Sequence, residues 1–481
     1  MKKRISFPVA FLTAVLILSG CSSVGKQEAG NKEVTEQGAS SAITEAASAD
    51  PYDRLEGLDY EGYRFRFCYY GTEANGWNPY IDVAESNGEV LNDAAFDRNA
   101  KVSELLNVSF SMIRDPAYET LFKNSIYAGD EEYDMALFWT DLNGATYMTE
   151  HLLFDWNDLP LVDLEADWYN QSANEAFSVA GTQFFGVSDM TFTVQQHFRF
   201  LYNKQLAEDN GLKSVYDDVL SGTFTFDKML ADIRKCYKDL NGNGEADDAD
   251  CFGFATNAPH TNLFFRNTGG PEVTVGPDGY EINIYSERIV TLVEKVVGLL
   301  QEKACFDTTQ GNAHYNVFNE GRALFAPYSS DPVLLRDYDV DFGYVPYPKL
   351  TEDQPYYTTT TGGFMGLPVS LSDPARTGAI IEATSIASHE LVIEAFISAY
   401  IEGKILRDKE SVDIYRMMRS SAVYDISYNT DPSGKLRTIS AYYKHFLDTK
   451  STDVASWYAA EGPGIKEKYD ELWKLASAKK E

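Results

Sequence analysis

The chain has 481 residues, of which 73 are acidic and 41 are Lys or Arg, and its formal net charge at pH 7 is −32. Nucleic acid and anionic membrane surfaces repel so acidic a protein, so we exclude both as charge-driven partners. A chain of this length exceeds what one small hydrophobic core normally supports, and two domains are therefore expected.

The first twenty residues have the pattern of an export signal. A positive start at 2–4 is followed by an uncharged apolar stretch, 7–18, that is too short to span a bilayer as a helix. The tetrapeptide that ends at Cys21 resembles the lipobox of bacterial lipoproteins, in which the cysteine is acylated, for example with palmitate, after cleavage. We therefore expect residues 1–20 to be a signal peptide. Cys21 then anchors the chain to the extracellular face of the cell membrane. The alternative is an ordinary secretory signal with a cysteine nearby by chance.

The segment after Cys21 is predicted to be a flexible linker. Residues 22–50 contain no aromatic side chain and consist mainly of small, polar and charged residues. Such a segment cannot bury enough apolar surface to fold. A coil of this length has an r.m.s. reach on the order of 30 Å. We assign 21–56 to the lipidated cysteine and linker, and expect the folded body to begin at about residue 57.

The first part of the folded body alternates between strand and helix patterns. Strands are predicted at 63–69, 108–113, 133–139, 184–187 and 198–202. Helices are predicted at 92–106, with Asn92 as N-cap, and at 118–127. This alternation indicates an α/β fold with a mostly parallel sheet.

The last third of the chain is helical in period. Helices are predicted at 377–406, 409–421, 435–448 and 453–476. Since no strand pattern lies between them, these helices are expected to pack as a group against the α/β part of the protein.

Residues 239–250 have the spacing of a calcium-binding loop. Oxygen-bearing side chains stand at positions 1, 3, 5, 9 and 12, and Gly244 stands at position 6, where the chain must turn sharply. The predicted ligands are Asp239, Asn241, Asn243, Glu245 through its carbonyl, Asp247 and Asp250. An Asp at position 12 reaches less readily than a Glu for bidentate contact, so we expect modest affinity and a structural Ca²⁺. The alternative is a solvated turn rich in Asn, Asp and Gly.

Four cysteines remain besides Cys21. Cys68, Cys236, Cys251 and Cys305 have no C-x-x-C spacing and no clustered histidine, so a zinc site is not expected. Cys236 and Cys251 flank the predicted calcium loop. The sequence is compatible both with a disulfide between them and with free buried thiols.

Several segments together resemble one family. They are 223–229, 239–254, 318–325, 342–349 and 376–411. Their order and spacing resemble the extracellular solute-binding lipoproteins of ABC importers, a broad family that includes carbohydrate-binding members, and the resemblance covers about 62–473. It implies a two-lobe, periplasmic-binding-protein-like (type II) α/β fold with a helical C-terminal extension. The expected lobes are 57–200 with 326–370 (lobe 1) and 201–325 (lobe 2), with the C-terminal helices at 371–481.

The sequence shows no known catalytic motif. There is no G-x-S-x-G elbow, H-E-x-x-H helix or P-loop, and the six histidines are scattered. Acidic pairs such as Asp155 and Asp158 are expected by chance among 73 acidic residues. We therefore predict a receptor and not an enzyme. A secreted lipoprotein glycoside hydrolase and a surface sensor or adhesion module that serves no transporter are the alternatives.

The predicted ligand is a sugar or oligosaccharide, because the chain is 14% aromatic and sugar sites combine aromatic faces with polar side chains. The candidate platforms are Trp139, Trp168, Tyr169 and Tyr328; the candidate polar contacts are Asp141, Asp189 and Arg199; Gly363 is a candidate for close backbone approach. Each aromatic residue could equally belong to the core. The expected partners are this solute, an ABC permease and the membrane through the lipid anchor, and the protein is expected to be a monomer.

Overall fold

The computed structural model describes residues 50–71, 78–138, 143–308, 311–329, 335, 338–429 and 438–478. Residues from Asp50 onward form one compact unit. The signal peptide, Cys21, the linker, Trp139 and Asp141 lie outside the described residues. No helix in the described part of the chain is long and apolar enough to cross a membrane.

The first lobe is built on a four-stranded sheet with the order β15-β3-β1-β2. Its strands are β1 (Tyr63–Tyr69), β2 (Val108–Arg114), β3 (Met135–Phe138) and β15 (Phe364–Gly366). Strands β1, β2 and β3 are parallel, and β15 is antiparallel to β3. Alternate side chains of these strands enter two different cores, so both faces of the sheet are covered.

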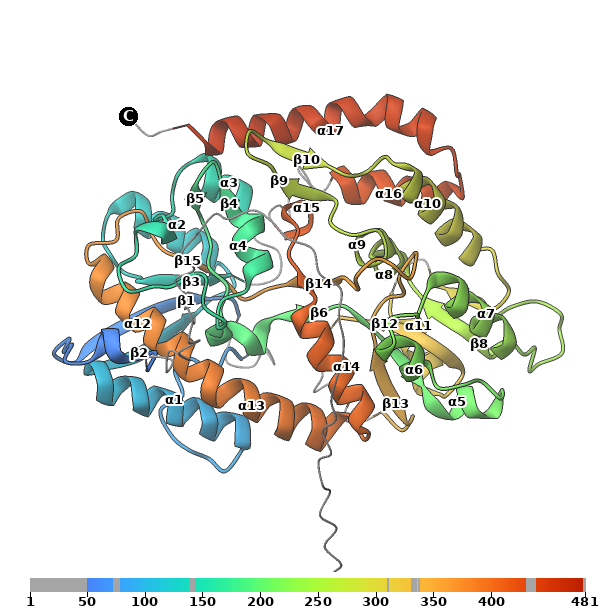
Figure 1. The fold of residues 1–481 in the computed structure, drawn as a ribbon, viewed down its shortest axis with the longest axis horizontal. Coiled ribbons are helices and arrows are strands. Elements are labelled where there is room, and N and C mark those ends of the chain that lie inside the picture. Colours follow the sequence, from blue (N-terminus) through green and yellow to red (C-terminus); the bar gives the residue numbers. More distant parts are fainter. Residues whose placement is uncertain are drawn as a thin grey trace, which may run out of the picture. The chain divides into compact units, whose positions relative to one another are not determined.

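Helices cover each face of this sheet (Figure 1). They are α1 (Val90–Leu106), α2 (Tyr118–Ala128), α3 (Gly144–Thr149), α4 (Gln171–Phe177) and α12 (Pro374–Ala387). Phe122 of α2 packs with Cys68 and Phe138 on one face. Val102 of α1 and Ile380 of α12 are in the core of the other face.

The second lobe is built on a five-stranded sheet with the order β11-β8-β12-β7-β13. Its strands are β7 (Arg199–Asn203), β8 (Phe252–Thr256), β11 (Cys305–Asp307), β12 (Ala323–Tyr328) and β13 (Phe342–Val345). Strands β8, β11 and β12 are parallel, whereas β7 is antiparallel to both β12 and β13.

Short helices and one hairpin complete this lobe. They are α5 (Lys204–Asp209), α6 (Val215–Leu220), α7 (Phe226–Cys236), α8 (Ala258–Asn262), α9 (Phe264–Asn267), α10 (Glu287–Leu299), α11 (Ala313–Asn319), and the strands β9 (Val273–Val275) and β10 (Tyr280–Ile282). Helix α7 begins at an N-cap, Thr225, whose side chain accepts a hydrogen bond from the Lys228 amide.

A small sheet connects the lobes. It contains β6 (Gln196–His197), β14 (Thr358–Thr361) and β16 (Ala422–Val423), in the order β16-β14-β6. Strand β6 leads into β7 of the second sheet, and β14 leads back into β15 of the first. Both strands therefore cross between the lobes, and Figure 1 shows them between the two larger sheets.

A long helical run makes a third connection, from Pro374 to Ile405. It begins as α12, which packs in the first lobe, and continues through π-helical turns at Ser388–Val392 and Phe396–Ile405, with α13 (Ile393–Ala395) between them. Ile397 and Ile401 share a core with Phe252 and Tyr344 of the second sheet. The run therefore packs against both lobes. The helical segment predicted at 377–406 is therefore confirmed, and the π-helical turns within it, each with an extra residue, were not predicted.

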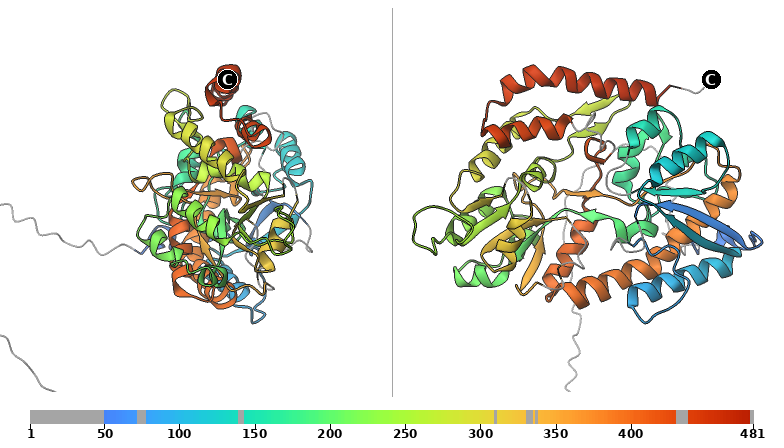
Figure 2. Two further views of the ribbon diagram at one scale, coloured as in Figure 1. Left: turned by 90° about the vertical axis from the view of Figure 1, so that its right-hand side faces the viewer. Right: turned by 180° about the vertical axis from the view of Figure 1, so that it is seen from behind.

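The C-terminal helices are α14 (Lys409–Ser420), α15 (Ile426–Asn429), α16 (Thr438–Thr449) and α17 (Val454–Ala476). Helix α16 contacts α8 and α10, whereas α17 contacts both β10 and α3. At the end of α17, the Leu475 carbonyl lies 3.0 Å from Nε2 of His151. Helix α17 therefore extends along one edge of the body to the first lobe, as Figures 1 and 2 show.

The structure corrects two other local predictions. Helix α1 begins at Val90 and not at Asn92, because the Asp93 carboxylate accepts hydrogen bonds from the chain before the helix, at Asn87 and Gly88. Residues 184–187 form only an isolated bridge, Gly186 to Met365, and not a strand.

The predicted lobe boundaries are also corrected. Residue 326 falls inside β12, and β13 pairs with β7, so both β12 and β13 belong to the second lobe. Strand β15 belongs to the first lobe, as expected for the end of the 326–370 segment. The boundary changes because β7, which follows the crossing strand β6, pairs with β12 on one edge and with β13 on the other.

The four cysteines in the described part of the chain are free thiols. Cys236 and Cys251 are buried, and burial raises the pKa of the Cys236 thiol to about 12.

Candidate functional site

The carboxyl ends of the parallel strands of both lobes meet the crossing strands. In the first lobe, Phe138 at the end of β3 pairs with Phe364, directly after β14 and its glycines. In the second lobe, Tyr328 at the end of β12 pairs with Arg199, directly after β6. Open α/β sheets bind ligands outside the carboxyl ends of their strands. We therefore place the candidate ligand site where these two edges face the crossing strands.

A hydrogen-bonded group of side chains occupies the second-lobe part of this edge. We call Asn257, His260, Tyr315 and Ser329 the His260 cluster. Nδ1 of His260 lies 2.7 Å from Oδ1 of Asn257, and Nε2 lies 3.3 Å from the hydroxyl oxygens of both Ser329 and Tyr315. His260, Tyr315 and Ser329 are each partly exposed. Polar groups and an aromatic ring therefore face one another where a ligand is expected.

The local fold explains why these residues meet. Asn257 follows β8 directly and caps α8 by accepting a hydrogen bond from the His260 amide at 3.1 Å, with proline in the first turn. Ser329 follows β12, the neighbouring strand of β8. Tyr315 lies on α11, which contacts both strands.

His260 is held in its neutral form. Burial and the nearby His314 imidazole lower the pKa of His260 to about 3. His314 is itself buried, and burial lowers its pKa to about 4. The two rings are 5.5 Å apart between centroids. Both imidazoles are therefore uncharged at neutral pH.

The structure brings two of the predicted ligand residues together at the same edge. Arg199 lies between the rings of Tyr328 and Tyr344, with its guanidinium carbon 5.1 and 4.4 Å from their centroids. Both Arg199 and Tyr328 are buried, at 2% and 3% exposure. The Tyr328 ring packs edge-on against the Tyr315 ring at 5.4 Å. Tyr328 therefore packs against the Tyr315 ring of the His260 cluster, and Arg199 packs against Tyr328 in turn. Direct contact of either residue with a ligand stays a prediction.

A second set of predicted ligand residues lies in the first lobe. Tyr169 is buried and donates a hydrogen bond from its hydroxyl to Glu382 at 2.9 Å. Trp168 is partly buried beside His389, at 6.5 Å between ring centroids. Asp189 and Tyr169 line a cavity of about 420 Å³ that also includes His389 and Arg419. This set does not meet Arg199 and Tyr328 at one place, so the predicted residues divide into two groups.

Gly363 lies at a close approach between the crossing segments. Its φ is +76°, and a Cβ there would come within 2.8 Å of Oγ1 of Thr191. The Thr191 hydroxyl donates a hydrogen bond to the Gly363 carbonyl at 2.8 Å. Gly363 is therefore required by its positive φ and by the close packing against Thr191.

The predicted calcium loop is closed at its base by a two-residue bridge. Lys238 and Cys251 exchange backbone hydrogen bonds of 3.0 and 3.1 Å. Inside the loop, the Asp239 carboxylate accepts hydrogen bonds from the amides of Gly242 and Gly244. The buried Asp250 accepts one from the Leu240 amide at 2.9 Å. The first and last predicted ligands therefore both fold back into the loop.

Two more of the predicted ligands, Asn241 and Asn243, bond to a third, Asp247. Its carboxylate accepts hydrogen bonds from the side-chain amides of Asn241 and Asn243, at 3.0 and 2.6 Å for the shortest pairs. In the described part of the chain, no three His, Cys, Asp or Glu side chains are grouped as a metal centre. A cation here would therefore depend on the two asparagines and the Glu245 carbonyl as well as on the acids. An all-oxygen set of this kind suits Ca²⁺.

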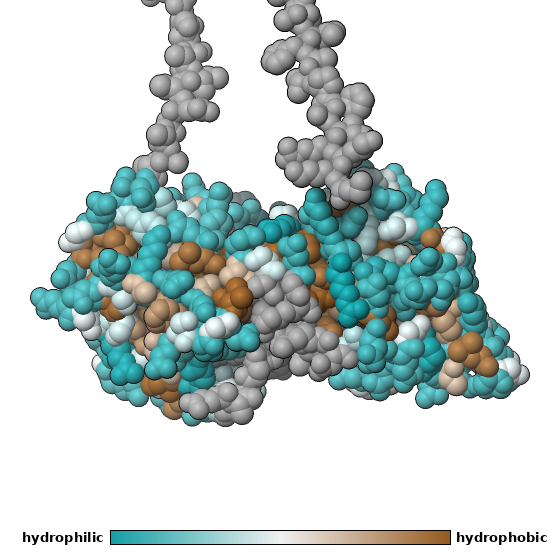
Figure 3. Space-filling model, turned by 90° about the horizontal axis from the view of Figure 1, so that it is seen from below, coloured by the Kyte–Doolittle hydropathy of each residue, from teal (hydrophilic) through white to brown (hydrophobic). Residues whose placement is uncertain are grey.

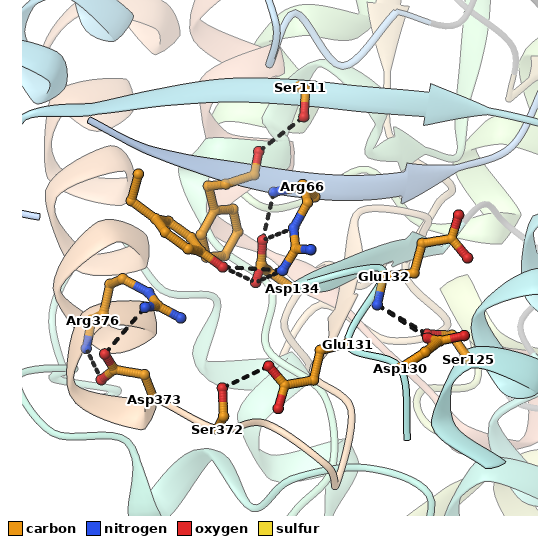
Figure 4. Close-up of polar contacts among 12 residues, drawn as sticks. Arg66, Ser111, Ser125, Asp130, Glu131, Glu132, Asp134, Ser372, Asp373 and Arg376 are labelled. Carbon is orange, nitrogen blue, oxygen red and sulfur yellow. Dashed lines mark hydrogen bonds and ion pairs between the residues drawn. The ribbon is translucent and has the colours of Figure 1, made fainter. Parts of the chain in front are cut away.

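A hydrogen-bonded network around the buried carboxylate of Asp134 lies at the amino ends of the strands of the first sheet, opposite the candidate site (Figure 4). Asp134, just before β3, accepts hydrogen bonds from the Arg66 side chain at 2.9 and 3.0 Å and from the Tyr63 hydroxyl at 2.6 Å. The Arg376 guanidinium stacks on the Tyr63 ring at 3.7 Å. Because the network lies at the amino end of β3, it joins β1 to β3 and α12 and is remote from the candidate site.

Sequence reasoning missed the His260 cluster. Its four residues come from three separate segments and have no motif spacing. One signal was available, because an apolar run at 252–256 directly precedes Asn257, and strand ends are where α/β proteins bind ligands.

Comparison with protein-family models finds no match, and neither does comparison with curated proteins. Solved structures do match. The cyclic α-maltosyl-1,6-maltose binding protein of Arthrobacter globiformis has a TM-score of 0.56 at 15% identity, over 86% of this chain and 99% of that one. The GacH receptor of Streptomyces glaucescens, also known in complex with acarbose, has a TM-score of 0.54 at 13% identity, over 85% and 99%.

A third match is an ABC substrate-binding protein from Listeria monocytogenes in complex with cycloalternan, with a TM-score of 0.50 at 15% identity, over 87% of this chain and 100% of that one. The chain has a periplasmic-binding-protein-like fold. The resemblance expected from the sequence is confirmed at the level of fold, including two α/β lobes and a helical C-terminal region. Within this fold, the His260 cluster belongs to the second lobe.

Proposed function

We propose that the protein is a sugar-binding receptor of an ABC importer, held at the extracellular face of the cell membrane by a lipid on Cys21. The observation that carries the proposal is the fold. The structural neighbours are a cyclic α-maltosyl-1,6-maltose binding protein, a receptor in complex with acarbose and an ABC substrate-binding protein in complex with cycloalternan. The ligand would lie between the lobes, at the carboxyl ends of the strands, and lobe closure would present the loaded form to a permease.

The chemistry of the described site supports a sugar. The His260 cluster offers hydroxyls, an amide and a neutral imidazole beside the Tyr315 ring. Sugars have hydroxyls around an apolar face, and sites that recognise them combine such polar groups with aromatic rings.

The surface supports a protein that is soluble once exported. Figure 3 shows a mostly hydrophilic face on which hydrophobic residues form small separate groups. Stable membrane attachment of such a body requires the proposed lipid on Cys21. We also propose that the loop from Asp239 to Asp250 binds a structural Ca²⁺, which would fasten α7 to β8.

Titration calorimetry of the purified full-length protein tests the function. The ligands are maltotetraose, β-cyclodextrin, cellotetraose and xylotetraose, with glutamate and a tripeptide as controls. We expect at least one oligosaccharide to bind with no release of reducing ends over hours. Binding of an amino acid or peptide alone would contradict the sugar proposal, and steady hydrolysis would favour the hydrolase alternative.

A further inference from the structure

We infer that His260 is a specificity-determining residue that accepts a hydrogen bond from a ligand hydroxyl through Nε2. The inference rests on the proposed sugar-binding function and deepens it, because it names the ligand group that the second lobe selects. Three features of His260 support it: the tautomer of its ring, the weak occupancy of its Nε2 lone pair and the uncharged surroundings of the ring.

Asn257 fixes the tautomer. Its side-chain amide nitrogen donates a hydrogen bond to the Gly311 carbonyl at 2.9 Å, so its oxygen is the atom that faces His260. That oxygen accepts from the His260 backbone amide at 3.1 Å and lies 2.7 Å from Nδ1. An amide oxygen only accepts, so Nδ1 carries the proton and Nε2 carries the lone pair. The ring therefore presents an acceptor on its Nε2 side.

The lone pair on Nε2 is only weakly engaged. The hydroxyls of Tyr315 and Ser329 each lie 3.3 Å from it, longer than the usual hydroxyl hydrogen bond of about 2.7–2.8 Å. Two donors share one lone pair, and both hydroxyls can rotate to other acceptors. A ligand hydroxyl that approaches closely can therefore take over the lone pair, while Tyr315 and Ser329 turn to accept or donate to the same ligand.

The surroundings hold the ring in place and leave it uncharged. The Tyr347 hydroxyl donates to the His260 carbonyl at 3.1 Å, which fixes the backbone. The groups that face the imidazole are Asn257 on α8, His314 and Tyr315 on α11, and Ser329 after β12. None of them is a carboxylate that would favour an imidazolium, and the pKa of His260 is lowered to about 3. The acceptor is therefore preserved across the physiological range.

The test uses the full-length protein and whichever of the four oligosaccharides binds the wild type. His260→Gln places an amide oxygen near the position of Nε2, whereas His260→Asn reaches only the position of Nδ1. We expect His260→Asn and His260→Ala to weaken Kd about tenfold or more, which corresponds to about 1.4 kcal/mol. We expect His260→Gln to stay within about threefold of the wild type.

Two further readouts separate a ligand contact from a structural role. With ¹⁵N-labelled histidine, sugar binding should shift the Nε2 resonance of His260 while its Nδ1 stays protonated. Wild-type affinity should be equal at pH 5 and pH 8. Thermal unfolding of each variant monitors folding, and His151→Asn, in the first lobe beside the Leu475 carbonyl, serves as the histidine control.

The outcomes distinguish the two proposals. If no oligosaccharide binds the wild type, the proposed function fails and this inference fails with it. If a sugar binds the wild type and all folded His260 variants equally, or leaves the Nε2 resonance unchanged, the function stands and the inference is wrong. Equal losses in His260→Gln and His260→Asn, together with a lower melting temperature, would also overturn it.

Discussion

Oδ1 of Asp189 lies 2.6 Å from Nη2 of Arg419, and this ion pair joins two segments that both enter the crossing sheet. Asp189 begins the 3₁₀ turn Asp189–Val194 that leads into β6, and Arg419 lies in the last turn of α14, which leads into β16. The other oxygen of Asp189 lies 2.6 Å from Nδ1 of His389, in the first π-helical turn of the long run. One carboxylate therefore ties together the segment before β6, the helix before β16 and the long helical run.

Asp189→Ala should destabilise the protein. Asp189 is 6% exposed, and removing one partner of a buried ion pair costs about 3–5 kcal/mol. Since the Arg419 side chain is 28% exposed and can regain water, we expect a smaller loss than that range, of about 2 kcal/mol. Urea denaturation measures it. Glu394→Gln is the control, because its pair with Arg416 is exposed and should matter by less than about 1 kcal/mol. A loss no greater than the control's would show that the pair is not structural.

His389 should give the protein a pH-dependent component of stability. The hydrogen bond that Nδ1 of His389 donates to the Asp189 carboxylate raises the pKa of His389 above its ordinary 6.5. The folded state therefore holds this proton more tightly than the unfolded state. The contribution is complete below pH 6.5 and is lost as the pH rises through the raised value. His389→Gln should flatten the fall in unfolding free energy between pH 6 and 8. Parallel curves for variant and wild type would contradict the assignment.

Calcium should raise the stability of the folded protein, as expected for a structural ion. An ion that binds only the folded state raises stability with the logarithm of its concentration. Chelation should therefore lower the melting temperature, and Asp239→Asn should abolish the response, because Asp239 is the first predicted ligand. Asp278→Asn, an exposed acid in the β9–β10 turn, is the control and should respond like the wild type. Identical melting curves of metal-stripped wild type with and without calcium would rule out the site.

Cys21 should be the membrane anchor. Cys21→Ala removes the thiol that would be acylated, so the variant should lose metabolic labelling with palmitate and leave the membrane fraction. Ser22→Ala, next to it, is the matched control and should stay in the membrane. A Cys21→Ala protein that remains in the membrane fraction without label would require another mode of attachment.

Local pattern was sufficient to predict much of the fold. The strand at 63–69 is confirmed with both bounds, and the helix predicted at 118–127 is α2, which begins at the predicted residue. These features depend on residues that are close together in the sequence, so the local pattern is enough to predict them. The same holds for the parallel first sheet, since alternating strands and helices leave few topologies.

The errors concern contacts between distant segments. Strand β13 was assigned to the wrong lobe because its partner, β7, is more than 130 residues earlier, and no local pattern specifies that pairing. The His260 cluster was missed for the same reason, since Tyr315 and Ser329 reach His260 only through the order β11-β8-β12. Asp189 was named as a candidate polar contact for the ligand, and that contact stays a prediction. Its ion pair with Arg419 depends on a helix 230 residues later.

Tyr328 and Tyr315 provide the last prediction, because one ring is buried and the other partly exposed. Tyr328 is 3% exposed and packs on Arg199, so Tyr328→Ala should lower the unfolding free energy by about 3–5 kcal/mol, as for other buried aromatic residues. Tyr315→Ala should cost less stability and weaken sugar binding by about 1–3 kcal/mol, because its ring borders the proposed ligand position.

The conservative variants complete this comparison. Tyr315→Phe keeps the ring and removes one of the two hydroxyls at Nε2 of His260, so affinity should stay within about threefold of the wild type. Calorimetry and urea denaturation on all three variants measure both quantities. If Tyr328→Ala folds with wild-type stability yet loses affinity, Tyr328 is the platform that the sequence predicted. Tyr315 would then be a neighbour and not a contact.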